Sequence, residues 1–104
     1  MTEPGRYREI WVRHPNGLAL CALISGDLGW LMCVAEDGSS CHSSRNPAYA
    51  GDADAVLPCR LGNGQEDLYP AAWFYPLPTV EAALCDFERT GERPAAIRWH
   101  ADFG

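Results

Sequence analysis

The residues of this chain that could carry chemistry are histidines, cysteines and pairs of carboxylates. The three histidines, His14, His42 and His100, are far apart in the sequence, and no two have the i, i+4 spacing that would place them on one helix face. Cys41 and His42 are adjacent on an expected strand, where neighbouring side chains point to opposite faces and do not easily share one metal ion. The sequence therefore predicts no metal site.

The cysteines are Cys21, Cys33, Cys41, Cys59 and Cys85. An odd number without close pairs is not typical of a disulfide framework or of a zinc ribbon. We expect reduced thiols that are mostly buried, because a free cysteine packs as a small hydrophobic residue. A nucleophilic Cys33 or Cys59 activated by a distant histidine is the alternative, since such partners need not be neighbours in the chain.

Carboxylate pairs and aromatic residues are the remaining candidates. The pairs are Glu36 with Asp37, Asp52 with Asp54, and Glu66 with Asp67. Paired carboxylates can act as acid and base, but these lie in expected turns and loops, so they are either solvated loop residues or contacts for a basic partner. Tyr69, Trp73, Phe74 and Tyr75 follow directly, and tyrosine and tryptophan beside acidic groups are typical of interface hot spots. Each aromatic residue is either core or interface, and the sequence assigns no catalytic residue or cofactor.

Composition and charge restrict the class of protein. The chain has 104 residues, 47% of them hydrophobic, which fits one folded domain over residues 1–104 with a loose tail at residues 1–5. Fourteen acidic residues oppose eight arginines, there is no lysine, and the net charge is −6. This charge repels nucleic acid and anionic lipid and suits a basic protein partner, although it also serves solubility alone.

Targeting signals are not evident in the sequence. The longest apolar run, residues 18–24, is much shorter than the ~20 residues that a membrane helix needs. The first five residues lack the basic and apolar regions of a signal peptide. We therefore expect a cytoplasmic protein that does not associate with membranes.

The first half of the chain is expected to form an antiparallel meander. Strands are predicted over residues 8–14, 18–25, 30–35 and 39–44. Turn signals separate them, above all Asp37-Gly38, which favours a tight hairpin. The unbroken apolar run of the second strand indicates a central strand covered on both faces.

The second half is expected to supply two more strands, a helix and a last strand. Residues 46–54 form a loop, residues 56–61 an edge strand containing Pro58, and residues 66–75 a bulged strand after an Asn63-Gly64 turn. A helix follows, capped by Thr79 with Glu81 in its first turn, and it ends at Gly91. Its apolar stripe consists of Val80, Ala83, Leu84 and Phe87. With a short strand around Ile97 and Trp99, the fold class is α+β: an antiparallel sheet of about five to six strands with one main C-terminal helix packed on one face.

Several of these segments, in this order, resemble a known family. They are Asn63-Gly64-Gln65 and the aromatic strand after it, the helix over residues 80–87, and Thr90-Gly91-Glu92-Arg93-Pro94 followed by Trp99. Over about residues 56–100 the chain resembles immunity protein family one of bacterial polymorphic toxin systems. The resemblance implies a protein that is encoded beside a toxin and binds it, often a nucleic-acid deaminase and sometimes a nuclease.

The residues of these motifs also have structural interpretations. Asn63 and Gly64 fit a turn, with Gln65 following it, and Gly91 fits a helix end. Pro94 and Trp99 would hold the last strand against the helix, and Arg93 would pair with Glu92 or with a carboxylate on the sheet. A toxin-binding role falls on other residues, which are Asp52, Asp54, Glu66, Asp67, Tyr69 and Trp73.

The sequence thus favours an immunity protein that is not an enzyme and that occludes the active site of a basic toxin domain. We expect it to be a monomer or a weak homodimer when free, with no cofactor and no nucleic-acid partner. One alternative is a small enzyme or ligand-binding domain with a pocket near Trp73 and Tyr75. The other is a homodimeric interaction module that pairs through an edge strand.

Overall fold

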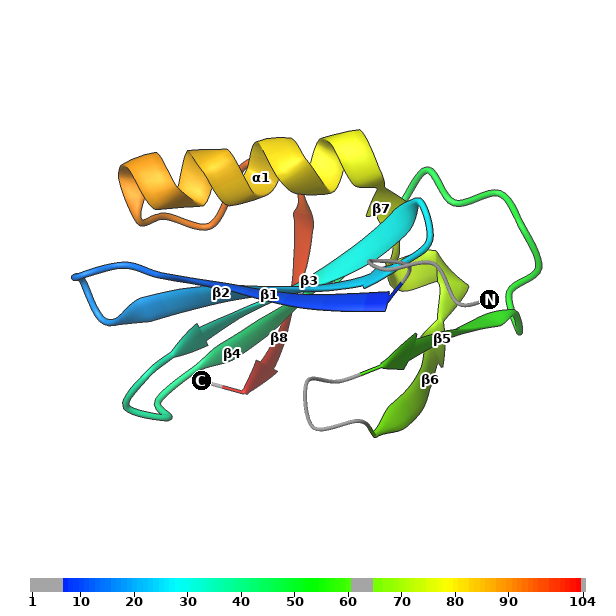
Figure 1. Cartoon of the computed structure of the whole chain (residues 1–104), viewed down its shortest axis with the longest axis horizontal. Coiled ribbons are helices and arrows are strands. Elements are labelled where there is room, and N and C mark those ends of the chain that lie inside the picture. Colours follow the sequence, from blue (N-terminus) through cyan, green and yellow to red (C-terminus); the bar gives the residue numbers. More distant parts are fainter. Residues whose placement is uncertain (1–6, 61–64, 104) are drawn as a thin grey trace.

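The main sheet separates the molecule into two sides. The computed structural model describes residues 7–60 and 65–103 of the chain. A six-stranded antiparallel sheet carries a helix, α1, on one face and a two-stranded hairpin on the other (Figure 1). The predicted α+β class is therefore confirmed.

The main sheet is a meander with a late strand added at its edge. Its strands are β1 (Tyr7–Arg13), β2 (Leu18–Ser25), β3 (Leu28–Ala35), β4 (Cys41–Arg45), β7 (Tyr75–Pro76) and β8 (Arg98–Phe103). The order is β1-β2-β3-β4-β8, and β7 pairs with the other end of β3. Strands β1 to β4 are neighbours in sequence order, which confirms the predicted N-terminal meander.

The position of strand β2 between two cores explains why its sequence is apolar at almost every position. Leu20 and Ala22 belong to the core beneath α1, whereas Cys21 and Leu23 belong to the core beneath the hairpin. Successive residues of a strand point to opposite faces, so a strand covered on both sides has no polar face to alternate with. The prediction of a central, doubly covered strand is confirmed.

Helix α1 (Leu77–Thr90) begins earlier than predicted. Pro78 lies in its first turn, where an N–H would have no helical partner in any case, so proline is compatible there. The predictions of a Thr79 cap and of Glu81 in the first turn are wrong: the cap position is Pro76, no side chain caps the helix, and its first turn holds no acidic residue.

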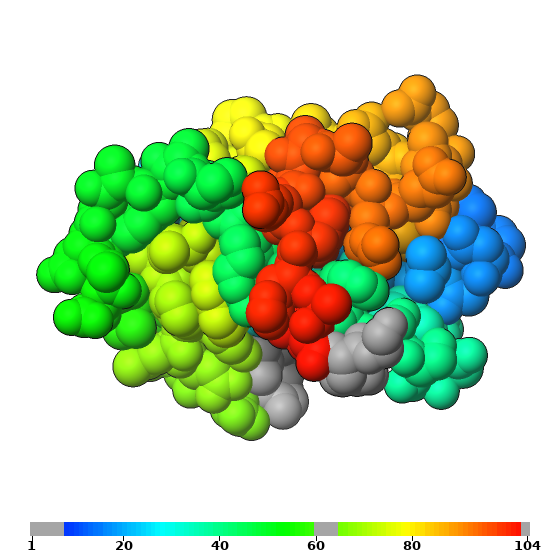
Figure 2. All heavy atoms as spheres, turned by 180° about the vertical axis from the view of Figure 1, so that it is seen from behind, coloured from blue at the N-terminus to red at the C-terminus, as the bar shows by residue number. Residues whose placement is uncertain are grey.

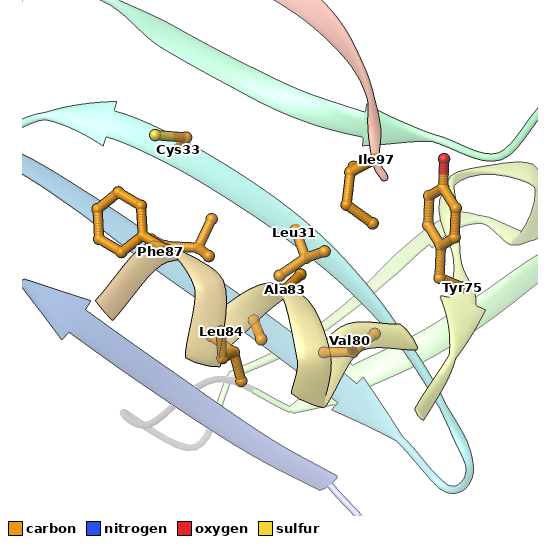
Figure 3. Packing of buried hydrophobic residues seen from close by; sticks show 10 residues of the cluster. Leu31, Cys33, Tyr75, Val80, Ala83, Leu84, Phe87 and Ile97 are labelled. Carbon is orange, nitrogen blue, oxygen red and sulfur yellow. The ribbon is translucent and has the colours of Figure 1, made fainter. Parts of the chain in front are cut away.

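The C-terminal end of α1 and its apolar stripe are as predicted. Gly91 has a left-handed φ of 73°, and its N–H donates to the Phe87 carbonyl over 2.7 Å. Figure 3 shows the stripe lying over β3, with Ile97 and Tyr75 at one end. The labelled stripe residues are Val80, Ala83, Leu84 and Phe87, and the labelled β3 residues are Leu31 and Cys33.

The hairpin consists of β5 (Val56–Arg60) and β6 (Glu66–Pro70), and it forms a separate two-stranded sheet. The bulged strand predicted over residues 66–75 is instead broken into β6, a 3-10 turn η1 (Ala71–Trp73) and β7. Pro70 cannot donate to a ladder, and at this point the chain leaves the hairpin for the main sheet. The predicted Asn63-Gly64 turn lies outside the described residues.

The loop predicted over residues 46–54 is confirmed, and the structure shows no strand or helix from residue 46 to residue 55. Within the described residues, no helix combines the length and the apolar character needed to span a membrane.

Candidate partner-binding surface

The strands of the hairpin present alternate residues to the main sheet and to the outside. Val56 is opposite Pro70 and Pro58 is opposite Leu68, so these four residues share one face with Glu66, which is two residues before Leu68. We call this set of five the hairpin outer face. Leu68 is 65% exposed and Val56 is 49% exposed, the two highest values among the large hydrophobic residues described. Exposed aliphatic side chains are therefore concentrated here.

Tyr69 lies on the inner side of the hairpin, and Trp73 follows in η1. The Tyr69 ring centroid is 4.7 Å from that of Trp30, and the Trp73 centroid is 5.5 Å from Trp30. Both residues are half-buried and pack against a core cluster that contains Phe74 and Cys59. They are mainly core residues, and only their rims are available to a partner.

The predicted Glu66-Asp67 pair is divided between the two faces of β6. Asp67 points inward, where its carboxylate accepts hydrogen bonds from the Tyr69 hydroxyl at 3.2 Å and from Gln65 Nε2 at 3.1 Å. Burial, together with the neighbouring Asp67 carboxylate, raises the pKa of Tyr69. Glu66 is exposed on the outer face. Strand alternation thus leaves one acid of the pair facing solvent.

Asp52 and Asp54 lie at the opposite end of the hairpin from Glu66. The Asp52 carboxylate accepts the Asp54 N–H at 2.9 Å, which folds the loop, and the Ala71 N–H donates to the Ala55 carbonyl at 2.9 Å, which joins the loop to the hairpin base. A five-residue strand spans about 13 Å. The structure therefore does not bring the two acidic pairs together but places exposed acids at both ends of the outer face.

The motif after α1 holds β8 in place. The Trp99 Nε1–H donates to the Pro94 carbonyl at 3.1 Å, as expected for residues that fix the last strand. Arg93 was expected to pair with Glu92 or with a carboxylate on the sheet, but no ion pair of Arg93 occurs among the described residues, and its Nη1 lies 3.2 Å from His42 Nδ1. The Asn16 amide donates to the Gly91 carbonyl at 2.8 Å, a contact between distant residues that sequence spacing gave no means of predicting.

All but one of the thiols are buried. Cys21, Cys33, Cys41 and Cys59 are free and buried, whereas Cys85 is free and exposed on α1. Burial raises the pKa of Cys21 to about 12 and of Cys59 to about 11, and it also raises the pKa of Cys33. These thiols therefore stay protonated and weakly nucleophilic at neutral pH.

Potential metal-binding side chains do not cluster in the described part of the chain. The side chains of residues 7–60 and 65–103 contain no group of three or more histidine, cysteine or acidic residues that could hold a metal ion.

A pocket was expected near Trp73 and Tyr75, and only Trp73 lines one. Tyr75 is buried, and its hydroxyl donates to the Arg45 carbonyl at 2.6 Å. Trp73 does border a pocket of about 500 Å³ together with His100. Val56 and Leu68 were not among the predicted contact residues, because they are recognised as surface residues only when the register of β5 and β6 is known.

The structure is a small α+β domain whose most exposed large hydrophobic side chains, among the described residues, lie on the hairpin outer face. The family model described as Immunity protein Imm1 matches residues 3–101, so the chain belongs to this family of immunity proteins. Comparisons with curated proteins and with solved structures gave no match. Membership implies that the partner of this domain is a cognate toxin protein.

Proposed function

We propose that this immunity protein binds its toxin through the hairpin outer face, with Leu68 at the centre of the contact and Glu66 and Asp54 at its two ends. The observation that carries the proposal is the 65% exposure of Leu68 on the hairpin outer face, between Glu66 and Pro70. Burying an exposed leucine contributes about 1.5–3 kcal/mol, enough to anchor an interface.

Charge supports a basic toxin. The net charge of −6 favours a positively charged partner and accelerates encounter with it. Enzymes that act on nucleic acid carry basic substrate clefts because they must bind phosphates. We therefore propose that the toxin acts on nucleic acid, with a deaminase as the leading candidate, and that the domain inhibits it by covering the cleft.

Occlusion requires contact area rather than catalysis. A stable complex buries about 1,200–2,000 Å² in total, so the rims of Tyr69 and Trp73 and the loop around Asp52 would extend the contact beyond the outer face. Asp67, tied to Tyr69 and Gln65, would hold β6 in shape and contribute only through its partly exposed edge. We propose a cytoplasmic site of action. We also propose that the free protein is a monomer, and sedimentation of the purified protein tests this oligomeric state.

Charge reversal at the hairpin tests the binding surface. Asp54→Lys with Glu66→Lys is expected to weaken toxin binding at least tenfold, mainly through slower association at low salt. The matched control is Glu81→Lys with Glu88→Lys, which makes the same change in net charge on exposed positions of α1. Surface plasmon resonance against the toxin encoded beside the gene measures both variants.

The two variants separate a local effect from a global one. Equal weakening by both would show that only net charge matters, and unchanged binding of the hairpin variant at low salt would remove Asp54 and Glu66 from the contact.

A separate assay tests the reaction of the toxin. The purified toxin is expected to deaminate cytosine or adenine, and this activity is expected to be lost when the immunity protein is added. A toxin that cleaves its nucleic acid instead would contradict the deaminase assignment.

A further inference from the structure

Two arginines face each other across the edge of the main sheet. Arg45 of β4 and Arg98 of β8 are direct partners in the antiparallel register, and His100 is the partner of Ser43 next to them. Like charges directly opposite each other destabilise a strand pair unless an anion lies between them. This cationic pair stands out in a chain whose net charge is −6.

The Arg45 guanidinium is held in a fixed position. It stacks over the Trp73 ring with 4.0 Å between the guanidinium carbon and the ring centroid, and its Nη1 donates to Ser43 Oγ at 2.9 Å and to the Ser44 carbonyl at 2.8 Å. A planar guanidinium fixed in this way loses little freedom when it binds a carboxylate through two parallel hydrogen bonds.

The charge of this cluster is only partly balanced. Asp102 Oδ1 lies 3.9 Å from Arg45 Nη2 and 3.8 Å from His100 Nε2, both longer than a hydrogen bond. Burial lowers the pKa of Arg45, an effect that Asp102 only partly offsets. Arg98 is exposed and forms no ion pair with any residue that the structure describes.

These groups surround a pocket. It has a volume of about 500 Å³, and its lining includes Arg45, Asn46, Trp73, Arg98, Trp99 and His100. Figure 2 shows this side of the molecule, with β8 in red between the green segment that follows β4 and the orange segment that follows α1. The pocket therefore offers cations and indole rings at the open edge of the sheet, whereas the Asn46 amide in its wall already donates to the Phe74 carbonyl at 2.8 Å.

We propose that this pocket binds a carboxylate, presented by an acidic side chain or by the carboxyl terminus of a protein partner. A singly charged group fits better than a phosphate because the surrounding net negative charge disfavours a dianion more strongly. The inference does not rest on toxin binding by the hairpin, and the free protein is sufficient to test it.

Titration of the isotope-labelled protein with small probes, at constant ionic strength, tests the pocket. N-acetylglycine presents a terminal carboxylate, N-acetylglutamic acid α-amide presents a side-chain carboxylate, and N-acetylglycinamide is the neutral control. The first two are expected to shift the indole N–H of Trp73 and the guanidinium N–H of Arg45 saturably, with a Kd on the order of millimolar. The probe that binds more tightly shows whether the pocket prefers a terminal carboxylate or a side-chain carboxylate.

Arg98→Gln is the decisive variant because Arg98 is exposed and its loss should leave the fold intact. We expect it to weaken carboxylate binding about tenfold, whereas Arg89→Gln, on the helix surface beside Asp86, leaves binding unchanged. The proposal is overturned by a lack of saturation with both carboxylates, by equal shifts with the neutral control, by tighter binding of inorganic phosphate, or by equal affinity in the two arginine variants.

Discussion

The two faces of the main sheet differ in how completely the element that covers each face is buried against it. Beneath α1, the core consists of apolar side chains and a buried Tyr75 hydroxyl that has its hydrogen-bond partner. Beneath the hairpin, the core consists of buried Cys21, Leu23, Trp30, Cys59 and Phe74, half-buried aromatic rings pack against it, and Trp30 Nε1 has no nitrogen or oxygen partner among the described residues. The helix side is closed over a buried apolar stripe, whereas the hairpin side leaves Val56 and Leu68 exposed on its outer face.

The same contrast separates Phe87 from Leu68. Phe87 is fully buried under α1, so Phe87→Ala is expected to lower the free energy of unfolding by about 3–5 kcal/mol. Leu68→Ala on the hairpin outer face should change it by no more than about 0.5 kcal/mol while weakening toxin binding. Urea unfolding of both variants checks the difference, and a large loss of stability in Leu68→Ala would show that the hairpin surface is structural after all.

Alkaline pH should act most strongly on the hairpin side, where the thiols with the largest pKa shifts, Cys21 and Cys59, are packed. Burial raises the pKa of Cys59 from 9.0 to about 11, so the folded state keeps a proton that the unfolded state loses. The stability that this thiol contributes is complete below pH 9 and is lost as pH rises towards 11, at about 1.4 kcal/mol per pH unit.

Replacing that thiol should flatten the pH dependence. Cys59→Ala is expected to reduce the slope of the free energy of unfolding against pH between pH 9 and 11. Urea unfolding under reducing conditions measures this slope. The exposed Cys85→Ser is the matched control and should leave the slope as it is. An unchanged slope in Cys59→Ala would mean that the Cys59 thiol is not protected from ionisation by its packing.

A smaller effect is expected at the end of α1. Gly91 has a φ of 73°, and a Cβ there would lie 2.6 Å from Asn16 Nδ2, so Gly91→Ala should cost about 1–2 kcal/mol for the backbone alone and more for the contact. Gly17→Ala, at a φ of 94° with nothing within 4 Å, isolates the backbone part. Thermal unfolding compares them, and equal losses would show that the Asn16 contact adds nothing.

The sequence predicted the helix side better than the hairpin side. The stripe from Val80 to Phe87 and the run of β2 are periodic patterns, and such patterns specify which face is buried. The start of α1 was misplaced because Pro78 fits both before a helix and inside its first turn.

The candidate surface depended on information that local patterns do not carry. The exposure of Leu68 follows from the register between β5 and β6, and the pairing of Arg45 with Arg98 follows from a contact between strands more than fifty residues apart. Acidic pairs could be recognised in the sequence, but which member faces solvent could not.

Amide hydrogen exchange of the complex with the toxin tests the central claim most directly, because it reports every segment in one experiment. Binding is expected to slow exchange over residues 56–60 and 66–70 and in the loop around Asp54, and to leave the exposed side of α1 unchanged. Protection confined to α1 or β1, with the hairpin exchanging as in the free protein, would contradict the account.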